Sequence, residues 1–90
     1  MRLDMFLKIS RLVPRRSVAQ ELCDAGLVSV NGGIAKSSKE LKPGDTVEIK
    51  RRSRLTKIEV LEIPSSKQVS KNAAGELYRL LDEVVIEDEA

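Results

Sequence analysis

Two stretches near the N-terminus have the hydrophobic spacing of helices. In residues 2–12, small or apolar residues recur at positions i, i+3, i+4 and i+7, which share one face of an α-helix. The four residues are Leu3, Phe6, Leu7 and Ser10. The same kind of spacing predicts a second helix over residues 16–25, and its members are Ala19, Leu22, Cys23 and Gly26.

The residues between and after these stretches mark the helix ends. Pro14 stops the first helix, because a proline pushes the residue before it out of helical geometry. Ser17 and Gln20, three residues apart, fit a capping box at the start of the second helix. Gly26 can take the left-handed backbone conformation that commonly ends a helix.

A hairpin is predicted directly after Gly26. Val28 and Val30 alternate with Ser29, which is typical of a strand, and Asn31-Gly32 is the strongest short-range signal for a tight hairpin turn. The rest of a small sheet, over residues 28–63, follows from three further stretches. They are residues 34–36, residues 46–50 after the turn dipeptide Pro43-Gly44, and residues 55–63.

The C-terminal third is more polar. Residues 65–75 are predicted as a linker and residues 87–90 as a frayed end. Between them, residues 76–85 have apolar positions at helical spacing, which predicts a short helix. These positions are Leu77, Leu80, Leu81 and Val84.

The element order predicts an α+β (α/β) fold with two N-terminal helices, a small sheet and a short C-terminal helix. Ninety residues suffice for one domain with a modest core. We expect the domain to span residues 1–64, and residues 65–90 to be a polar linker, a short helix and an acidic tail.

Charge is unevenly distributed along the chain. Residues 1–57 carry 13 Lys/Arg and 6 Asp/Glu, whereas residues 58–90 carry 3 and 8. A basic body of this kind suits a polyanionic partner. A basic surface that is merely solvated fits the charge count equally well. The charge count alone therefore does not show whether the body binds a polyanion.

Enzymatic and metal-binding functions find no support in the sequence. There is no histidine, and no nucleophile stands beside an evident base. The single Cys23 excludes an internal disulfide and is expected to be a packed, inert thiol. We therefore expect a non-catalytic cytoplasmic protein that uses no cofactor or metal, has no small-molecule substrate, and neither crosses a membrane nor carries a secretory signal.

The basic residues suggest a phosphate-binding surface. Lys8, Arg11 and Arg15 recur at i, i+3 and i+7, opposite the apolar face of the first helix. Arg15 and Arg16 precede a helix N-terminus, where the dipole disfavours positive charge, although free N–H groups and guanidinium forks together suit a phosphate. Lys36 and Lys39 extend this surface.

A second basic cluster and an acidic residue allow two interpretations each. Arg51, Arg52 and Arg54 either bind a partner or are simply solvated. Asp4 is expected to cap the helix start or to orient a basic side chain through an ion pair. The only aromatic residues are Phe6 and Tyr78, which argues against base stacking on single strands and suits folded RNA read through its shape and phosphates. Composition alone does not separate RNA from DNA.

The ordered motifs of residues 1–50 resemble the RNA-binding domain named after ribosomal protein S-4. They are Arg2-Leu3-Asp4 with Phe6-Leu7, Arg15-Arg16-Ser17 with Ala19 and Leu22, Gly26-x-Val28-x-Val30-Asn31-Gly32, and Lys42-Pro43-Gly44-Asp45-x-Val47. The resemblance implies an α-L motif, in which two N-terminal helices pack on a short, mostly antiparallel sheet and bind RNA along the helices and the adjoining loop. It also implies that Arg2 and Arg16 contact RNA, with Lys8, Arg11, Arg15 and Lys36 in support.

The start of the chain is most similar to the stand-alone family members of ribosome-associated quality control. The resemblance implies binding to rRNA and tRNA on the obstructed large ribosomal subunit carrying peptidyl-tRNA. On that subunit, a partner tailing factor would add alanine residues to the C-terminus of the nascent chain. Two alternatives remain: a ribosome-assembly or tRNA-binding accessory, and a protein-interaction adaptor that uses the sheet or the acidic tail.

Overall fold

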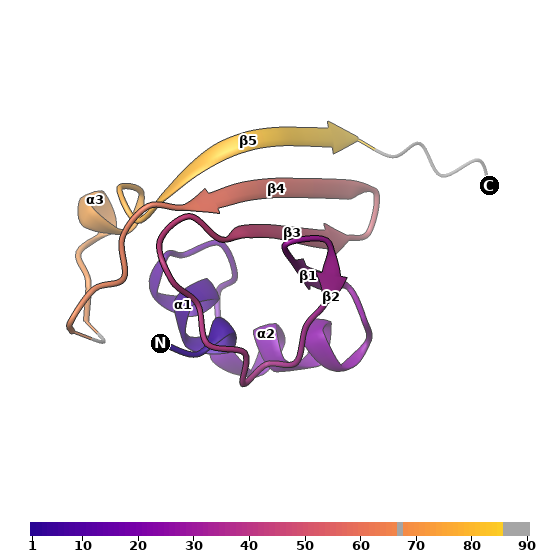
Figure 1. Cartoon of the computed structure of the whole chain (residues 1–90), viewed down its shortest axis with the longest axis horizontal. Coiled ribbons are helices and arrows are strands. Elements are labelled where there is room, and N and C mark those ends of the chain that lie inside the picture. The colour runs from indigo at the N-terminus through magenta and orange to yellow at the C-terminus, as the bar shows by residue number, and fades with distance from the viewer. Residues whose placement is uncertain (67, 86–90) are drawn as a thin grey trace.

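A computed structural model describes residues 1–66 and 68–85, in which two helices lie on one side of an antiparallel sheet (Figure 1). The sheet order is β2-β1-β3-β4-β5, and each neighbouring pair is antiparallel. The predicted α+β class is confirmed. The elements are α1 (Leu3–Ile9), α2 (Arg16–Asp24), β1 (Val28–Val30), β2 (Gly33–Ile34), β3 (Thr46–Arg51), β4 (Arg54–Val60), α3 (Lys71–Ala74) and β5 (Tyr78–Val85).

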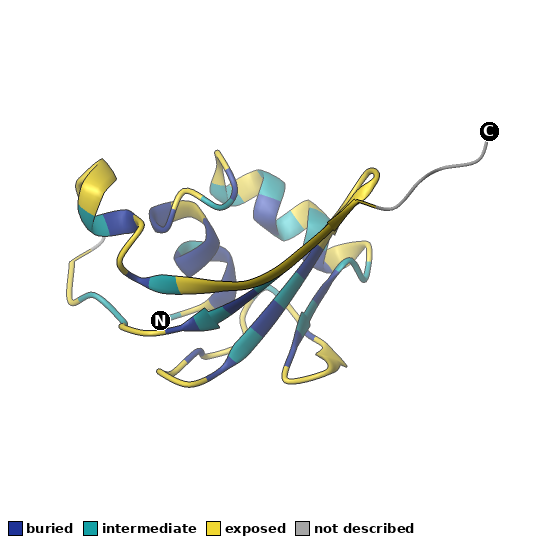
Figure 2. Cartoon of the chain, turned by 90° about the horizontal axis from the view of Figure 1, so that it is seen from above, coloured by how far each residue is buried: buried dark blue, intermediate teal, exposed yellow. Residues whose placement is uncertain are grey.

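The core lies between the two helices and the sheet. The predicted inner face of α1 is buried, since Leu3, Phe6 and Leu7 are fully inaccessible and Ser10 is nearly so. The other large contributors come from the sheet and the loop after α1, and include Val13, Val28, Val47, Ile58 and Val60. Figure 2 shows buried and half-buried residues alternating along the central strands, whereas β5 is exposed along most of its length.

The predicted first helix is too long at its C-terminal end. α1 ends at Ile9, and Arg11 takes a left-handed φ of 62°. The reason is burial of Val13, whose side chain is inaccessible and whose N–H donates to the carbonyl of Leu7 over 3.1 Å. A helix continued to residue 12 would not allow this return of the chain into the core.

The predicted stop and hairpin are confirmed. Gly26 has a φ of 75°, and the N–H groups of Gly26 and Leu27 donate back into the last turn of α2, which forms a Schellman motif. Asn31 and Gly32 have φ values of 51° and 87° between β1 and β2. Positive φ at both central residues is the geometry of the tight turn that Asn-Gly favours.

The predicted helix over residues 76–85 is wrong, because this segment is β5. It pairs with β4 from Val60↔Tyr78 to Arg54↔Val85. Without β5, β4 would be an open edge of the sheet. The backbone N–H and C=O groups of β4 hydrogen-bond with those of β5, and this pairing overrides the local helical spacing. The apolar residues at that spacing are mostly exposed, except Leu77, which is buried at the strand entry.

One helical turn, α3, lies within the predicted linker. Ser70 caps it, since its hydroxyl accepts from the N–H of Ala73 over 3.2 Å. The predicted frayed end, residues 87–90, lies outside the described residues. Within residues 1–66 and 68–85, no helix is both long and apolar enough to cross a membrane.

Candidate nucleic-acid interface

Asp4 is a buried carboxylate at the point where α1 meets α2. Its side chain is fully inaccessible, yet both oxygens are satisfied. Oδ2 accepts from Nε2 of Gln20 at 2.9 Å and from Nε of Arg16 at 3.1 Å, both on α2. Oδ1 accepts from the N–H of Met5 at 2.8 Å and lies 3.3 Å from Nε of Arg2. One carboxylate therefore joins two arginines that are distant in sequence.

The protonation of Asp4 follows from these contacts. Burial alone would raise the pKa of the carboxyl, because it disfavours the charged form. The hydrogen bonds from Gln20, Arg16 and the Met5 amide, together with the positive charge of Arg16, outweigh burial, and the pKa of Asp4 is lowered. Asp4 is thus ionised at neutral pH and holds both guanidinium groups.

The prediction that Asp4 orients a basic side chain through an ion pair is confirmed. The capping box predicted for α2 is wrong. Arg15 occupies the cap position without a side-chain hydrogen bond, and Gln20 turns its amide to Asp4 instead. The contribution of Gln20 was missed because its spacing from Ser17 matched a cap, and no local signal relates it to Asp4.

Arg2 and Arg16 keep much of their surface free while Asp4 holds them. Their side chains are 43% and 40% exposed. Arg16 uses only Nε toward Asp4, so its two terminal nitrogens make no hydrogen bond within the described part of the chain. They border a shallow hollow of about 250 Å³, lined by Met1, Arg2, Met5, Arg16 and Glu40. We call this region the Asp4 corner.

The segment after the hairpin completes the corner. The N–H groups of Leu3 and Asp4, at the start of α1, donate to the carbonyls of Lys39 and Ser37 over 2.8 and 3.1 Å. The loop thereby satisfies orphan donors of the helix N-terminus. The side chains of Lys36 and Lys39 are exposed, and this backbone pairing holds their loop beside Arg2.

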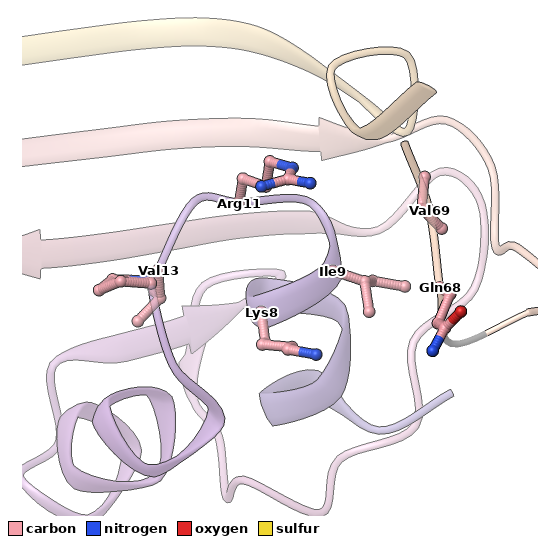
Figure 3. Close-up of a pocket in the computed structure, with 7 residues that line it drawn as sticks. Lys8, Ile9, Arg11, Val13, Gln68 and Val69 are labelled. Atoms are coloured by element: carbon pink, nitrogen blue, oxygen red, sulfur yellow. The ribbon is translucent and has the colours of Figure 1, made fainter. Parts of the chain in front are cut away.

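The other predicted basic residues lie elsewhere. Lys8 and Arg11 are at the opposite end of α1, where they border a hollow of about 450 Å³ together with Gln68 and Val69 (Figure 3). Arg15 is exposed at the start of α2. The structure therefore brings Arg2, Arg16 and the Lys36–Lys39 loop together, and it separates Arg11 from them.

The comparisons with known proteins agree with one another. The S4 domain family matches residues 1–47. A protein of Streptococcus pneumoniae named RQC P-site tRNA stabilizing factor is 44% identical over 98% of both chains. Proteins of the same name from Bacillus subtilis and Helicobacter pylori are each 41% identical, over 92% and 79% of this chain and 94% and 84% of theirs. This chain belongs to the S4-domain family of RQC P-site tRNA stabilizing factors.

Two solved structures have the same fold as this chain. The trimeric structure of heat shock protein 15 from Vibrio cholerae has a TM-score of 0.80 and 31% identity, and the match covers 89% of this chain and 80% of that one. The solution structure of a hypothetical protein has a TM-score of 0.79 and 35% identity, with 91% and 98% coverage. The structural similarity therefore extends well beyond residues 1–47 and covers most of the chain, including the arrangement of α1 and α2 on the sheet.

Cys23 behaves as expected for a packed thiol in this S4-domain fold. It is 5% exposed and belongs to the core. Burial, and then the negative charges of Asp4 and Asp24, raise the pKa of the thiol to about 11. A neutral, buried thiol is a poor nucleophile and a poor metal ligand.

Proposed function

We propose that this protein is a non-catalytic, cytoplasmic RNA-binding factor of ribosome-associated quality control. It binds rRNA and the peptidyl-tRNA on the obstructed large ribosomal subunit, and there it supports a tailing factor that adds C-terminal alanine to the nascent chain. The names of its relatives support the ribosomal P-site as the location. Family membership supports RNA as the ligand.

The observation that carries the proposal is the Asp4 corner. An arginine that is held at Nε but free at its terminal nitrogens presents a preorganised fork toward solvent. Such forks match phosphate oxygens and form charge-assisted hydrogen bonds. Asp4 also holds Arg2, which precedes α1, through Nε and one terminal nitrogen, so both guanidinium groups are positioned and less side-chain freedom is lost on binding. Lys36 and Lys39 add positive charge on the loop beside Arg2, whereas Lys8, Arg11 and Arg15 add it outside the corner.

The experiment is co-sedimentation of the protein with large ribosomal subunits carrying peptidyl-tRNA, over a series of salt concentrations. We expect Arg2→Ala and Arg16→Ala each to weaken association by about tenfold or more, since a hydrogen bond to a charged group contributes roughly 1.5–3 kcal/mol. Arg79→Ala is the control, because Arg79 pairs with Glu59 across β4 and β5, far along the chain from the corner. Arg79→Ala removes one positive charge, as Arg2→Ala and Arg16→Ala do.

The salt series distinguishes RNA from protein as the ligand. If phosphates are neutralised, the logarithm of the affinity falls steeply with the logarithm of the salt concentration, and each lost phosphate contact reduces that slope by about 1. Parent-like sedimentation of both corner variants would refute the proposal.

A further inference from the structure

We propose a second RNA phosphate site, separate from the Asp4 corner, in a pocket between the loop after α1 and the turn that joins β3 to β4. The inference rests on the proposed function, since it assigns a second segment of RNA backbone to the same protein. The pocket has a volume of about 510 Å³. It is lined by Arg11, Leu12, Arg51, Arg52, Ser53, Arg54, Thr56 and Glu83, and we call it the arginine pocket.

The turn carries positive charge in a way that the fold does not require. Arg51 and Arg54 are direct partners in the β3–β4 register. Like charges opposite each other destabilise a sheet. Arg52 has a φ of 50°, a conformation that Gly, Asn or Asp adopts at lower cost. Departures from local rules that bring no structural gain are expected at functional sites.

Arg11 reaches the same pocket through a second unusual backbone conformation. Within residues 1–66 and 68–85, three residues other than glycine have a positive φ, and Arg11 and Arg52 are two of them. The third is Asn31. The backbone geometry has a local cause in each case, since Arg52 and Asn31 lie in hairpin turns and Arg11 turns the chain back toward buried Val13, but only Asn31 is a residue type that favours a positive φ. Two separate segments thus both place an arginine at a positive φ on this pocket.

The charge of the pocket is largely unneutralised. In the described part of the chain, Arg11, Arg51 and Arg52 form no ion pair, and Arg54 lies 3.9 Å from its only acidic partner, Glu83. Four guanidinium groups therefore face one carboxylate. Such a concentration of charge attracts a polyanion and is screened by salt.

The lining favours RNA phosphate over an acidic protein segment. Arginine serves in protein interfaces too, but there it accompanies buried aromatic or apolar anchors. The exposed large apolar residues of the described chain all lie outside this pocket, and Leu12, which lines it, is half-buried against the core. Phosphate recognition needs only positioned forks and positive charge.

The two sites lie at opposite ends of α1. Arg2 directly precedes the helix and Arg11 follows it by two residues. Seven helical residues rise about 10 Å, so the two sites are spaced to take separate portions of RNA. Two linked sites raise the overall affinity, because the second binding event is intramolecular.

The test is a pair of charge changes with opposite expected signs. Arg51→Gln/Arg54→Gln should weaken binding to large ribosomal subunits by about tenfold and lower the salt slope by about 1 to 2. Glu83→Gln should strengthen binding by about twofold to fivefold, since it releases Arg54. The controls are Arg79→Gln and Asp82→Asn. Glu83 pairs with Thr56, and Asp82 pairs with the next residue of β4, Lys57. Successive residues of a strand point to opposite faces of the sheet, so Asp82 lies on the face opposite Glu83.

A photo-crosslinking phenylalanine analogue in place of Ser53 identifies the macromolecule. Attachment to RNA of the subunit supports the site, and attachment to a ribosomal protein overturns it. Parent-like binding of the pocket variants also overturns it. If Arg2→Ala or Arg16→Ala weakens binding in that case, the proposed function stands without a second site, whereas parent-like binding of both corner variants refutes the proposed function itself. Circular dichroism of each variant verifies folding.

Discussion

Arg16 on α2 donates from Nε to Oδ2 of Asp4 on α1 over 3.1 Å, although the two are twelve positions apart in the chain. This contact ties the helix–helix packing to the candidate RNA surface, because the same guanidinium is partly exposed. Stability and RNA binding are therefore linked through one buried carboxylate.

Asp4→Asn should weaken RNA binding even though it makes the protein more positive. Asparagine replaces two charged acceptor oxygens with one neutral oxygen and an NH2 donor, so it holds Arg2 and Arg16 less firmly and their guanidinium groups become more mobile. We expect an association with large ribosomal subunits that is about tenfold weaker. Asp24→Asn makes the same charge change at an exposed position of α2 and should bind like the parent or slightly better. Stronger binding by Asp4→Asn would mean that net charge alone governs association.

The stability of the protein should depend on pH through Asp4. The pKa of this group is lowered on folding, so its contribution is present above the ordinary value of 3.8 and is lost as pH falls through the lowered folded value. Asp4→Asn lacks this component and should be less stable at neutral pH by about 1–3 kcal/mol. Urea unfolding at about pH 7 and about pH 3 measures both proteins. The difference between them should shrink at the lower pH.

Arg16→Lys should separate charge from geometry. A lysine keeps the positive charge, but its donors share one nitrogen, so it cannot hold Asp4 and also present a planar two-nitrogen fork to a phosphate. We expect unfolding free energies within about 1 kcal/mol of the parent, because an ion pair to Asp4 is still possible. RNA affinity should nevertheless drop nearly as far as in Arg16→Ala. Full affinity in the lysine variant would show that the fork geometry is unimportant.

The thiol of Cys23 should be slow to react in the native protein. It is buried, and its pKa is raised to about 11, so little thiolate forms at neutral pH. A thiol reagent should label native protein far more slowly than protein unfolded in urea. Cys23→Ala should cost on the order of 1 kcal/mol of unfolding free energy, as a small cavity does. It should leave RNA binding unchanged, and rapid native labelling would contradict the burial.

Gly32→Ala should destabilise the hairpin through backbone strain alone. Gly32 has a φ of 87°, and a Cβ at this position would meet no atom within 4 Å. The expected loss is about 1–2 kcal/mol. Gly33→Ala is the matched control, since its φ is not positive and its added Cβ would only touch the carbonyl of Val30 at 3.9 Å. Thermal unfolding of both variants checks this, and equal stabilities would mean that the turn tolerates a side chain.

The sequence by itself determined the elements whose signals are local. The apolar face of α1, the stop at Gly26 and the Asn31-Gly32 turn all follow from residues within one or two turns of each other, and all three are present in the structure. The identity of Asp4 as an ion-pair partner was also predictable, because basic residues flank it in the sequence. Nothing local, however, indicated that its partner on α2 would be Arg16.

Tertiary structure decided the features that depend on distant partners. Residues 78–85 became a strand because β4 offered an open edge, which no helical spacing can reveal. Burial of Val13 ended α1 early and turned Arg11 away from Arg2 and Arg16 toward Arg51, Arg52 and Arg54. Hydrophobic spacing records which side of an element is buried, whereas the partner of each side chain is set by packing between segments far apart in the chain.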